Sequence, residues 1–459
     1  MVRIAKQNKE EIMRQIYQGK IDSIAVSQSN LVDDIVLAMH KNGISECLKR
    51  GFEDKRADNT TVPFDLVLHL AIAAKMKVHS SLSDIPFALT DHRTICELGY
   101  SMYDTARDIK TGLMSEGTIR ALIGKYDHNE FISGYISTVQ NFMLPKMNIT
   151  PNIHILDCTK IEVNYSNKSY EGSDVIKDEG KYKRGYKLAT IRGITGNTGI
   201  IEDIRFGPIS QHDLSLSRNM LLESPVLKRG DIIINDKGFL SRSVINFLKG
   251  ERGIDTYVPI RKNMDAYNFA VETAKFENEW ISHPNKKRKQ EIAFVTDVGQ
   301  YWNDEHPEHN VPINACVVRD KITGEYFVFV TTDIEKSAVQ IVKTYELRPE
   351  IEEDYRQLKD FWKLEDFKST KINTILFHIV CVLLGYLFFQ LYTLLPEGEH
   401  CSNKSLPVIL KKYRPTVSAH YVIYIDNYFG VLSLFELVEV YSQCDERIRS
   451  LLSPIIKTI

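Results

Sequence analysis

The stretch YELRPEIEEDYRQLKDFWK, residues 345–363, has the periodicity of an amphipathic helix with one charged edge. Because proline is tolerated only in the first turn of a helix, we predict that this helix begins near Pro349. At about 100° per residue, Glu352 shares one edge with three cations, Arg356, Lys359 and Lys363. The helix has an apolar face predicted to pack in the core (Ile351, Tyr355, Leu358 and Trp362) and a face predicted to meet solvent (Glu353, Asp354, Gln357 and Asp360).

The ordinary interpretation of such a sequence is a surface helix with charge pairs at i,i+4 spacing. A more specific pattern is also present: two residues separate Tyr345 from Arg348, three separate Arg348 from Glu352, and six separate Glu352 from Lys359. This spacing resembles the Y-R-E-K signature of bacterial insertion-sequence transposases of the DDE type. The resemblance implies two catalytic aspartates upstream, and DNA as the substrate.

The composition is that of an ordinary globular protein, long enough for two or three domains. The 459 residues are 43% apolar and 26% charged. The net charge of −2 at pH 7 does not by itself favour nucleic-acid binding, so a DNA-binding surface must come from local clustering of the 58 Lys and Arg residues. The seven cysteines are an odd number without a C-x-x-C pair, which fits reduced thiols in a cytoplasm.

One segment has the length and composition of a membrane span. Residues 374–395 form an apolar run of 22 residues, interrupted mainly by His378, Gln390 and two threonines. The alternative is the central helix of a large core. We favour the core helix, because no second span is present and the charged helix before it must pack against something. His378 is then expected to be a hydrogen-bonded core residue.

Residues 1–148 are predicted to form an all-helical N-terminal region. Helices are expected at residues 10–17, 31–41, 63–77, 115–125 and 130–144. The segment SEGTIRALIGKY at 115–126 begins with a serine cap and is short and amphipathic, as in the recognition helix of a helix-turn-helix. A short core helix has the same features, so the sequence leaves both interpretations open.

From residue 153 the pattern changes to strands. HILDCTKIEV, KLATIRGIT and GIIEDIRFG are predicted to form three antiparallel strands, followed by a helix, a strand, a helix and a strand up to residue 260. This order resembles an RNase-H-like domain, an α/β (α+β) mixed sheet flanked by helices, with its first part at 149–265. The remaining segments are predicted as a β-rich insertion outside that core (266–340), the second part of the catalytic core (341–395) and a helical C-terminal region (396–459).

Two aspartates lie where this sheet is expected to place a site. Asp157 stands inside the first strand, where an ionised carboxylate needs a cation or strong donors. Asp236 ends the short fourth strand, although taken alone it could equally cap the next turn. Converging carboxylates repel one another unless divalent ions separate them, and oxygen ligands suit Mg²⁺ or Mn²⁺. We therefore predict that Asp157, Asp236 and Glu352 are catalytic and hold two ions.

The resemblance also implies DNA-binding residues. Tyr345, Arg348 and Lys359 match signature positions that contact phosphates near the transposon end. The segment VPIRKN resembles the basic segment after the second aspartate in the family, which implies DNA contacts by Arg261 and Lys262. A solvated strand end would have the same sequence, so this interpretation depends on the resemblance.

The whole chain is then expected to be a cut-and-paste transposase that binds terminal inverted repeats with its N-terminal region. The resemblance further implies a homodimer on two DNA ends, a bacterial cytoplasmic and nucleoid-associated location, and no membrane. In relatives a tryptophan of the insertion holds a flipped base, for which Trp280 and Trp302 are the candidates. The alternatives are a catalytically idle or domesticated DNA-binding relative and an RNase-H-like nuclease.

Overall fold

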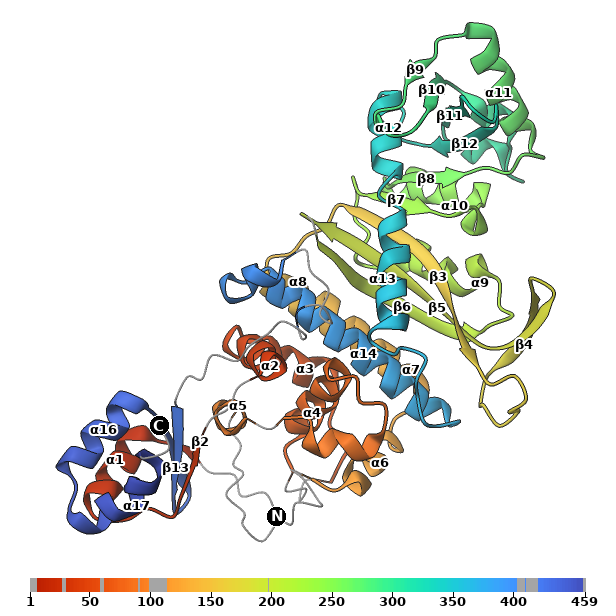
Figure 1. The fold of residues 1–459 in the computed structure, drawn as a ribbon. Helices are drawn as coiled ribbons and strands as arrows, with labels where there is room; N and C mark the ends of the chain where they lie inside the picture. Colours follow the sequence, from red (N-terminus) through yellow and green to blue (C-terminus); the bar gives the residue numbers. More distant parts are fainter. Residues whose placement is uncertain are drawn as a thin grey trace. The chain divides into compact units, whose positions relative to one another are not determined.

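The chain folds into two compact units. The computed structural model describes residues 6–26, 30–57, 62–89, 91–98, 114–196, 198–402, 409 and 420–456. The first unit combines Met1–Thr138 with Leu358–Ile459, and the second is Val139–Gln357. Figure 1 labels most of the helices and strands of both units.

The first unit contains a helical body around one long helix, α14 (Ile372–Thr393). Every residue of α14 from Ile375 to Tyr392 is buried. His378 donates a hydrogen bond from Nε2 to the Lys363 carbonyl at 3.1 Å, and burial lowers its pKa to about 3. By length and composition α14 could cross a membrane, but the prediction of a core helix and a core histidine fits its burial. The helices that surround it are α2 (Leu31–Lys41), α4 (Phe64–Met76), α6 (Glu116–Ile123) and α7 (His128–Ile136).

Both ends of the chain contribute to a small α/β module in the same unit. Its sheet has the strand order β1-β14-β13-β2. The predictions of an all-helical N-terminal region and of a helical C-terminal region are therefore wrong at these strands. β1 and β2 have only two and four residues, too few to show alternation, and their partners lie at the other end of the chain. The elements are β1 (Lys6–Gln7), α1 (Lys9–Tyr17), β2 (Ser23–Val26), β13 (His420–Ile425), β14 (Tyr428–Ser433), α16 (Leu434–Gln443) and α17 (Glu446–Ile456).

The second unit is built on a mixed sheet whose strands follow the predicted order, with one additional strand, β4, that was not predicted. β3 pairs antiparallel with β5 and parallel with β7, and β7 pairs parallel with β8. This is the mixed, helix-flanked arrangement expected of an RNase-H-like domain. The elements are β3 (Ile153–Val163), β4 (Asp174–Asp178), β5 (Lys181–Thr195), β6 (Thr198–Pro208), α9 (Asp213–Glu223), β7 (Ile232–Asn235), α10 (Arg242–Phe247) and β8 (Asp255–Pro259).

The predicted insertion continues this sheet instead of standing outside it. β12 pairs antiparallel with β8 and so joins the strands of the insertion to the central strands. Together, the described strands β3 to β12 form one ten-stranded sheet. The apolar core around Ala270 of α11 and Val317 of β11 also includes Val258 of β8 and Ile245 of α10, so the insertion and the first part of the domain share one core. Its elements are α11 (Asp265–Glu277), β9 (Ile281–Ser282), β10 (Gln290–Val295), β11 (Asn314–Asp320) and β12 (Tyr326–Thr331).

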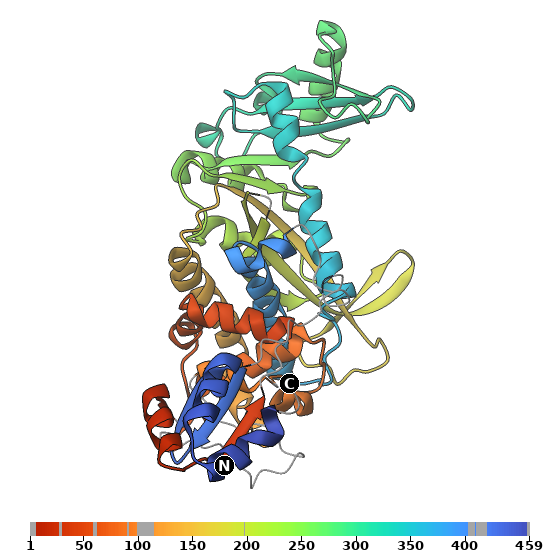
Figure 2. The same cartoon turned by 60° about the vertical axis from the view of Figure 1, so that its left-hand side comes forward.

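The two faces of the sheet are covered by different helices. Leu156 of β3 and Ile191 of β5 pack with residues of α9 on one face. On the other face, α13 (Pro349–Asp360) begins at the predicted proline and follows α12 (Ala338–Tyr345), and both are drawn in cyan (Figure 2). The four residues of its predicted core face are at most 6% exposed: Ile351, Tyr355, Leu358 and Trp362.

Candidate active site

Asp157 and Asp236 lie side by side where the parallel pairing of two neighbouring strands, β3 and β7, stops. The pairing of β3 with β7 ends at Leu156 opposite Asn235, so each aspartate is the residue that follows the last pair. Asp157 is still within β3, whereas Asp236 is the first residue after β7 and precedes a short 3₁₀ turn, Lys237–Phe239. The register of the two strands therefore brings the two carboxylates to one place, as predicted.

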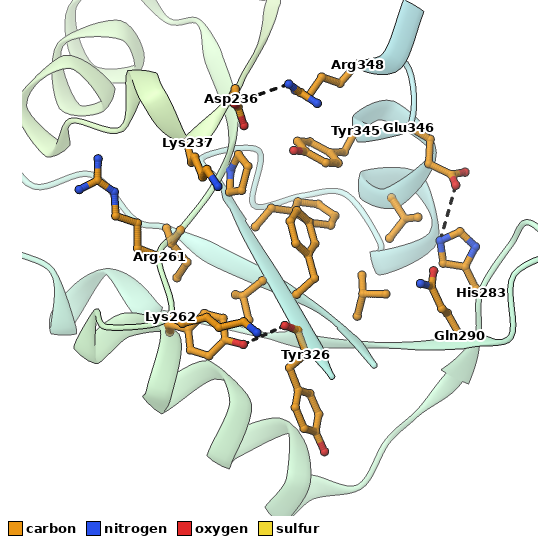
Figure 3. Close-up of a pocket in the computed structure, with 18 of the residues that line it drawn as sticks. Asp236, Lys237, Arg261, Lys262, His283, Gln290, Tyr326, Tyr345, Glu346 and Arg348 are labelled. Atoms are coloured by element: carbon orange, nitrogen blue, oxygen red, sulfur yellow. Dashed lines mark hydrogen bonds and ion pairs between the residues drawn. The ribbon is translucent and has the colours of Figure 1, made fainter. Parts of the chain in front are cut away.

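Arg348 connects these two carboxylates with Glu352. Its Nη1 lies 2.8 Å from Glu352 Oε1, and its Nη2 lies 3.6 Å from Asp236 Oδ2 and 3.8 Å from Asp157 Oδ2. All three predicted acids thus face one guanidinium group. The family resemblance implies that Arg348 contacts DNA phosphates, whereas the structure places Arg348 among the acids; one of the dashed lines in Figure 3 marks its pair with Asp236.

The charges at this place depend on one another. Burial raises the pKa of Asp157 to about 6, opposed by a hydrogen bond from the Cys158 amide to Asp157 Oδ1 at 2.8 Å and by Arg348. Asp236 and Glu352 raise the pKa of Asp157 further. Burial alone would lower the pKa of Arg348, but the surrounding carboxylates raise it above its usual value. The Arg348 cation at the centre therefore offsets part of the effect that burial and the neighbouring acids have on the pKa of Asp157.

Two buried polar contacts fix α13 on the sheet, and neither was predicted. Arg192 of β5 is 4% exposed and donates from Nε to Asp354 Oδ2 at 2.5 Å and from Nη1 to Glu350 Oε2 at 2.9 Å. Tyr355 donates to the Asp157 carbonyl at 2.7 Å. An arginine within a strand pattern was the available signal for the first contact.

The structure corrects two predictions about the helix faces. Asp354, assigned to the solvent face, is 5% exposed because Arg192 holds it against the sheet. Lys363, assigned to the charged edge, lies beyond the last helical residue, Asp360, and has a φ of 55°. The 3.6-residue period could not show where the helix ends, since no proline or glycine marks that point.

A cavity of about 680 Å³ lies beside Asp236 and Arg348. Tyr345, the last residue of α12, lines it and stacks on Phe329 of β12, with ring centroids 4.6 Å apart. Burial raises the pKa of Tyr345 above its usual value. Figure 3 shows Tyr345, Arg348 and Asp236 together at one part of this cavity. The cavity next to the acids is therefore lined by aromatic and charged side chains.

The other predicted DNA contacts are distributed differently. Arg261 and Lys262 line the cavity from the loop after β8, and both are exposed (Figure 3). Lys262 Nζ lies 3.9 Å from Glu325 Oε1, a separation too long for a hydrogen bond. Lys359 belongs to the first unit, where it pairs with Glu365 at 3.1 Å.

The two candidate tryptophans of the insertion pack under arginines. Trp302 lies beneath Arg242, 5.7 Å from the guanidinium carbon to the ring centroid, and Trp280 lies beneath Arg319 at 4.1 Å. Neither tryptophan lines the cavity beside the acids, whereas Tyr345, Phe327 and Phe329 do. Aromatic surface next to the site thus comes from β12 and α12.

Comparison with known families agrees with this arrangement. A family model described as the transposase DDE domain matches residues 149–388, more than half of the chain. The chain belongs to the DDE transposase family. The matched range includes β3, β7 and α13, and therefore Asp157, Asp236 and Glu352. No curated protein matches the chain.

Transposases of this family generally use divalent metal ions. The donor chemistry of this transposase fits such ions, because three carboxylates face a single cationic group within 4 Å. Among the described residues, however, no group of three or more His, Cys, Asp or Glu side chains is arranged to hold a metal ion. The guanidinium of Arg348 contacts the oxygens that would be ligands, so a metal ion and Arg348 would compete for them.

Proposed function

We propose that this transposase is a cut-and-paste enzyme of an insertion sequence and a member of the Y-R-E-K group. The observation that carries the proposal is that Asp157 and Asp236 of the sheet and Glu352 of α13 all lie within 4 Å of one guanidinium group. Asp157, Asp236 and Glu352 would hold two divalent ions. When bound, such ions activate a water or a 3′-hydroxyl group and stabilise the leaving oxygen of the phosphodiester.

The residues around the acids support binding of a DNA strand in the cavity. Arg261 and Lys262 offer exposed cations for phosphates, and Tyr345 with Phe329 offers an aromatic surface. Within the described part of the chain, the buried Nε of Arg348 finds no hydrogen-bond acceptor. A phosphate oxygen would satisfy that donor and draw the guanidinium away from the acids. We extend the same role to Lys359 at the end of α13.

The remaining parts of the proposal concern the DNA ends of the insertion sequence. We assign recognition of the inverted repeats to residues 1–148, in which α6 begins with the predicted cap: Ser115 accepts from the Thr118 amide. We further propose that two copies of the chain act together on two DNA ends. These assignments follow the family resemblance, and DNA footprinting at each end of the insertion sequence would test them.

The test of the function is a joining assay with the DNA that flanks the gene. With Mg²⁺, the protein is expected to cleave at the element's ends and to join a supplied 3′-hydroxyl end to a target plasmid. With excess chelator and the same DNA, neither product should form. Hydrolysis without joining would identify an RNase-H-like nuclease instead. Binding of the ends without any product would identify an idle DNA-binding relative.

A second measurement tests the DNA path through the cavity. Lys262→Ala is expected to weaken binding of the DNA ends. It should also reduce the magnitude of the slope of log K against log salt by about 0.9, the contribution of one phosphate contact. Lys275→Ala is the matched control, because Lys275 is an exposed lysine of α11 that pairs with Glu272 and does not line the cavity. Equal slopes for the two variants would remove Lys262 from the DNA path.

A further inference from the structure

Tyr355 joins the helix of Glu352 to the strand of Asp157 through a single buried hydroxyl group. Tyr355 is 6% exposed, and its hydroxyl donates to the Asp157 carbonyl oxygen at 2.7 Å. Thr190 Oγ1 of β5 lies 2.8 Å from the same hydroxyl. Because the one phenolic proton goes to the carbonyl, Thr190 must donate to the tyrosine oxygen. A chain of hydrogen bonds therefore runs from β5 through α13 to β3.

The position of this hydroxyl relates directly to the acids. Asp157 and Thr190 are cross-strand partners, so the Tyr355 hydroxyl lies over one specific pair of the sheet. Asp157 is also the first residue of β3 beyond its pairing with β7. Glu352 precedes Tyr355 by three residues, roughly 4.5 Å along the helix axis. Fixing Tyr355 over this pair thus fixes the distance from Glu352 to Asp157.

We propose that Tyr355 is a positioning residue that sets the geometry of the three acids. This proposal rests on the proposed function, since it gives the acids a common task. Arg192 anchors α13 to β5 through Glu350 and Asp354. The Tyr355 hydroxyl, in contrast, links α13, which carries Glu352, by a hydrogen bond to β3, which carries Asp157. Its loss should disturb the site more than it disturbs the fold.

The chain offers a matched control for removal of this hydroxyl. Tyr186 of β5 is also buried, and its hydroxyl donates to the Glu171 carbonyl at 2.7 Å, the same length as the Tyr355 bond. Tyr186→Phe and Tyr355→Phe therefore each delete one phenolic hydrogen bond to a backbone carbonyl within the same unit. Only the second deletion reaches the strand of a predicted metal ligand.

The experiment measures Mn²⁺ affinity without DNA, cleavage rate, end binding and melting temperature for both variants. Tyr355→Phe is expected to lower Mn²⁺ affinity and cleavage rate by about 10- to 100-fold with unchanged end binding, as substitution of groups that orient metal ligands does. Tyr186→Phe should keep the wild-type Mn²⁺ affinity and rate. Both variants should melt at slightly lower temperatures, because each loses one buried hydrogen bond. The melting temperature therefore measures the effect of that loss on the fold, separately from its effect on the site.

The outcomes separate this inference from the proposed function. If the wild-type protein cleaves and Tyr355→Phe matches Tyr186→Phe in Mn²⁺ affinity and rate, Tyr355 has no positioning role. If the wild-type protein does not cleave, the proposed function fails, and the Mn²⁺ comparison still decides whether Tyr355 orders the acids. Should Tyr355→Phe not fold, the inference is also overturned, because the hydroxyl then serves the fold of the domain and not the geometry of the acids.

Discussion

Replacing Glu352 with glutamine is expected to lower the rate of end cleavage by about a thousandfold or more. A metal-bound carboxylate contributes several kcal/mol to stabilising the transition state of phosphodiester cleavage, and about 4 kcal/mol corresponds to a thousandfold in rate. Glutamine keeps an oxygen that can accept from Arg348, and the Glu352 side chain is 56% exposed, so the fold should be unaffected. End binding, measured by gel shift with the flanking DNA, should remain.

Glu353 provides the control for this substitution. It is the next residue of α13, and its carboxylate pairs with Arg356 at 2.6 Å on the exposed side of the helix. Glu353→Gln makes the same chemical change one residue away and should leave cleavage at the wild-type rate. Substantial cleavage by Glu352→Gln, or an equal loss in Glu353→Gln, would remove Glu352 from the catalytic set.

Local sequence pattern was sufficient for the elements that carry the site. Alternation and a hairpin signal placed β3, β5 and β6, and the proline at position 349 placed the start of α13. The convergence of Asp157 and Asp236 followed from the expectation that β3 and β7 are neighbours, which the register confirms. These features depend on residues close together in the chain or on a known order of strands.

The sequence could not show which distant strands pair. The β1–β14 and β2–β13 pairs join opposite ends of the chain, and the β8–β12 pair joins the predicted insertion to the central sheet. Backbone hydrogen bonds at a sheet edge accept many sequences, so the choice of partner leaves little trace in the residues. The short strands at the N-terminus therefore escaped detection, and the insertion was placed outside the sheet.

Buried charges were the other feature beyond the reach of periodicity. Asp354 falls on the polar side of α13 by its angle, yet Arg192 from the strand beneath pairs with it. His154 of β3 is likewise buried between Glu202 and Asp231. Burial alone would lower the pKa of His154, but hydrogen bonds with Asp231 and Glu202 raise it to about 9. Such residues look like solvent-facing residues until their partners are known.

Replacing Arg192 with methionine is expected to lower the free energy of unfolding by about 3–5 kcal/mol. Removal of one partner from a buried ion pair leaves the other charge in a low-dielectric environment, and methionine retains much of the arginine volume. Asp354, whose side chain is 8% exposed, would lose its guanidinium partner. The melting temperature should fall by roughly 10 °C for a domain of this size. Urea unfolding gives the free energy directly.

Two further variants show that the loss comes from burial of an unpaired charge. Arg356→Met removes an arginine of α13, the helix that carries Asp354, but the pair of Arg356 with Glu353 is exposed on both sides, so the expected cost is at most about 1 kcal/mol. Arg192→Met combined with Asp354→Leu removes both charges and should recover part of the stability lost by Arg192→Met. If the double variant is no more stable than the single one, the arginine acts through packing and not through charge. Because α13 also carries Glu352, Arg192→Met should cleave more slowly than the wild-type protein, and the double variant should recover part of the cleavage rate. Such a recovery would link the anchoring of α13 to the chemistry of the site.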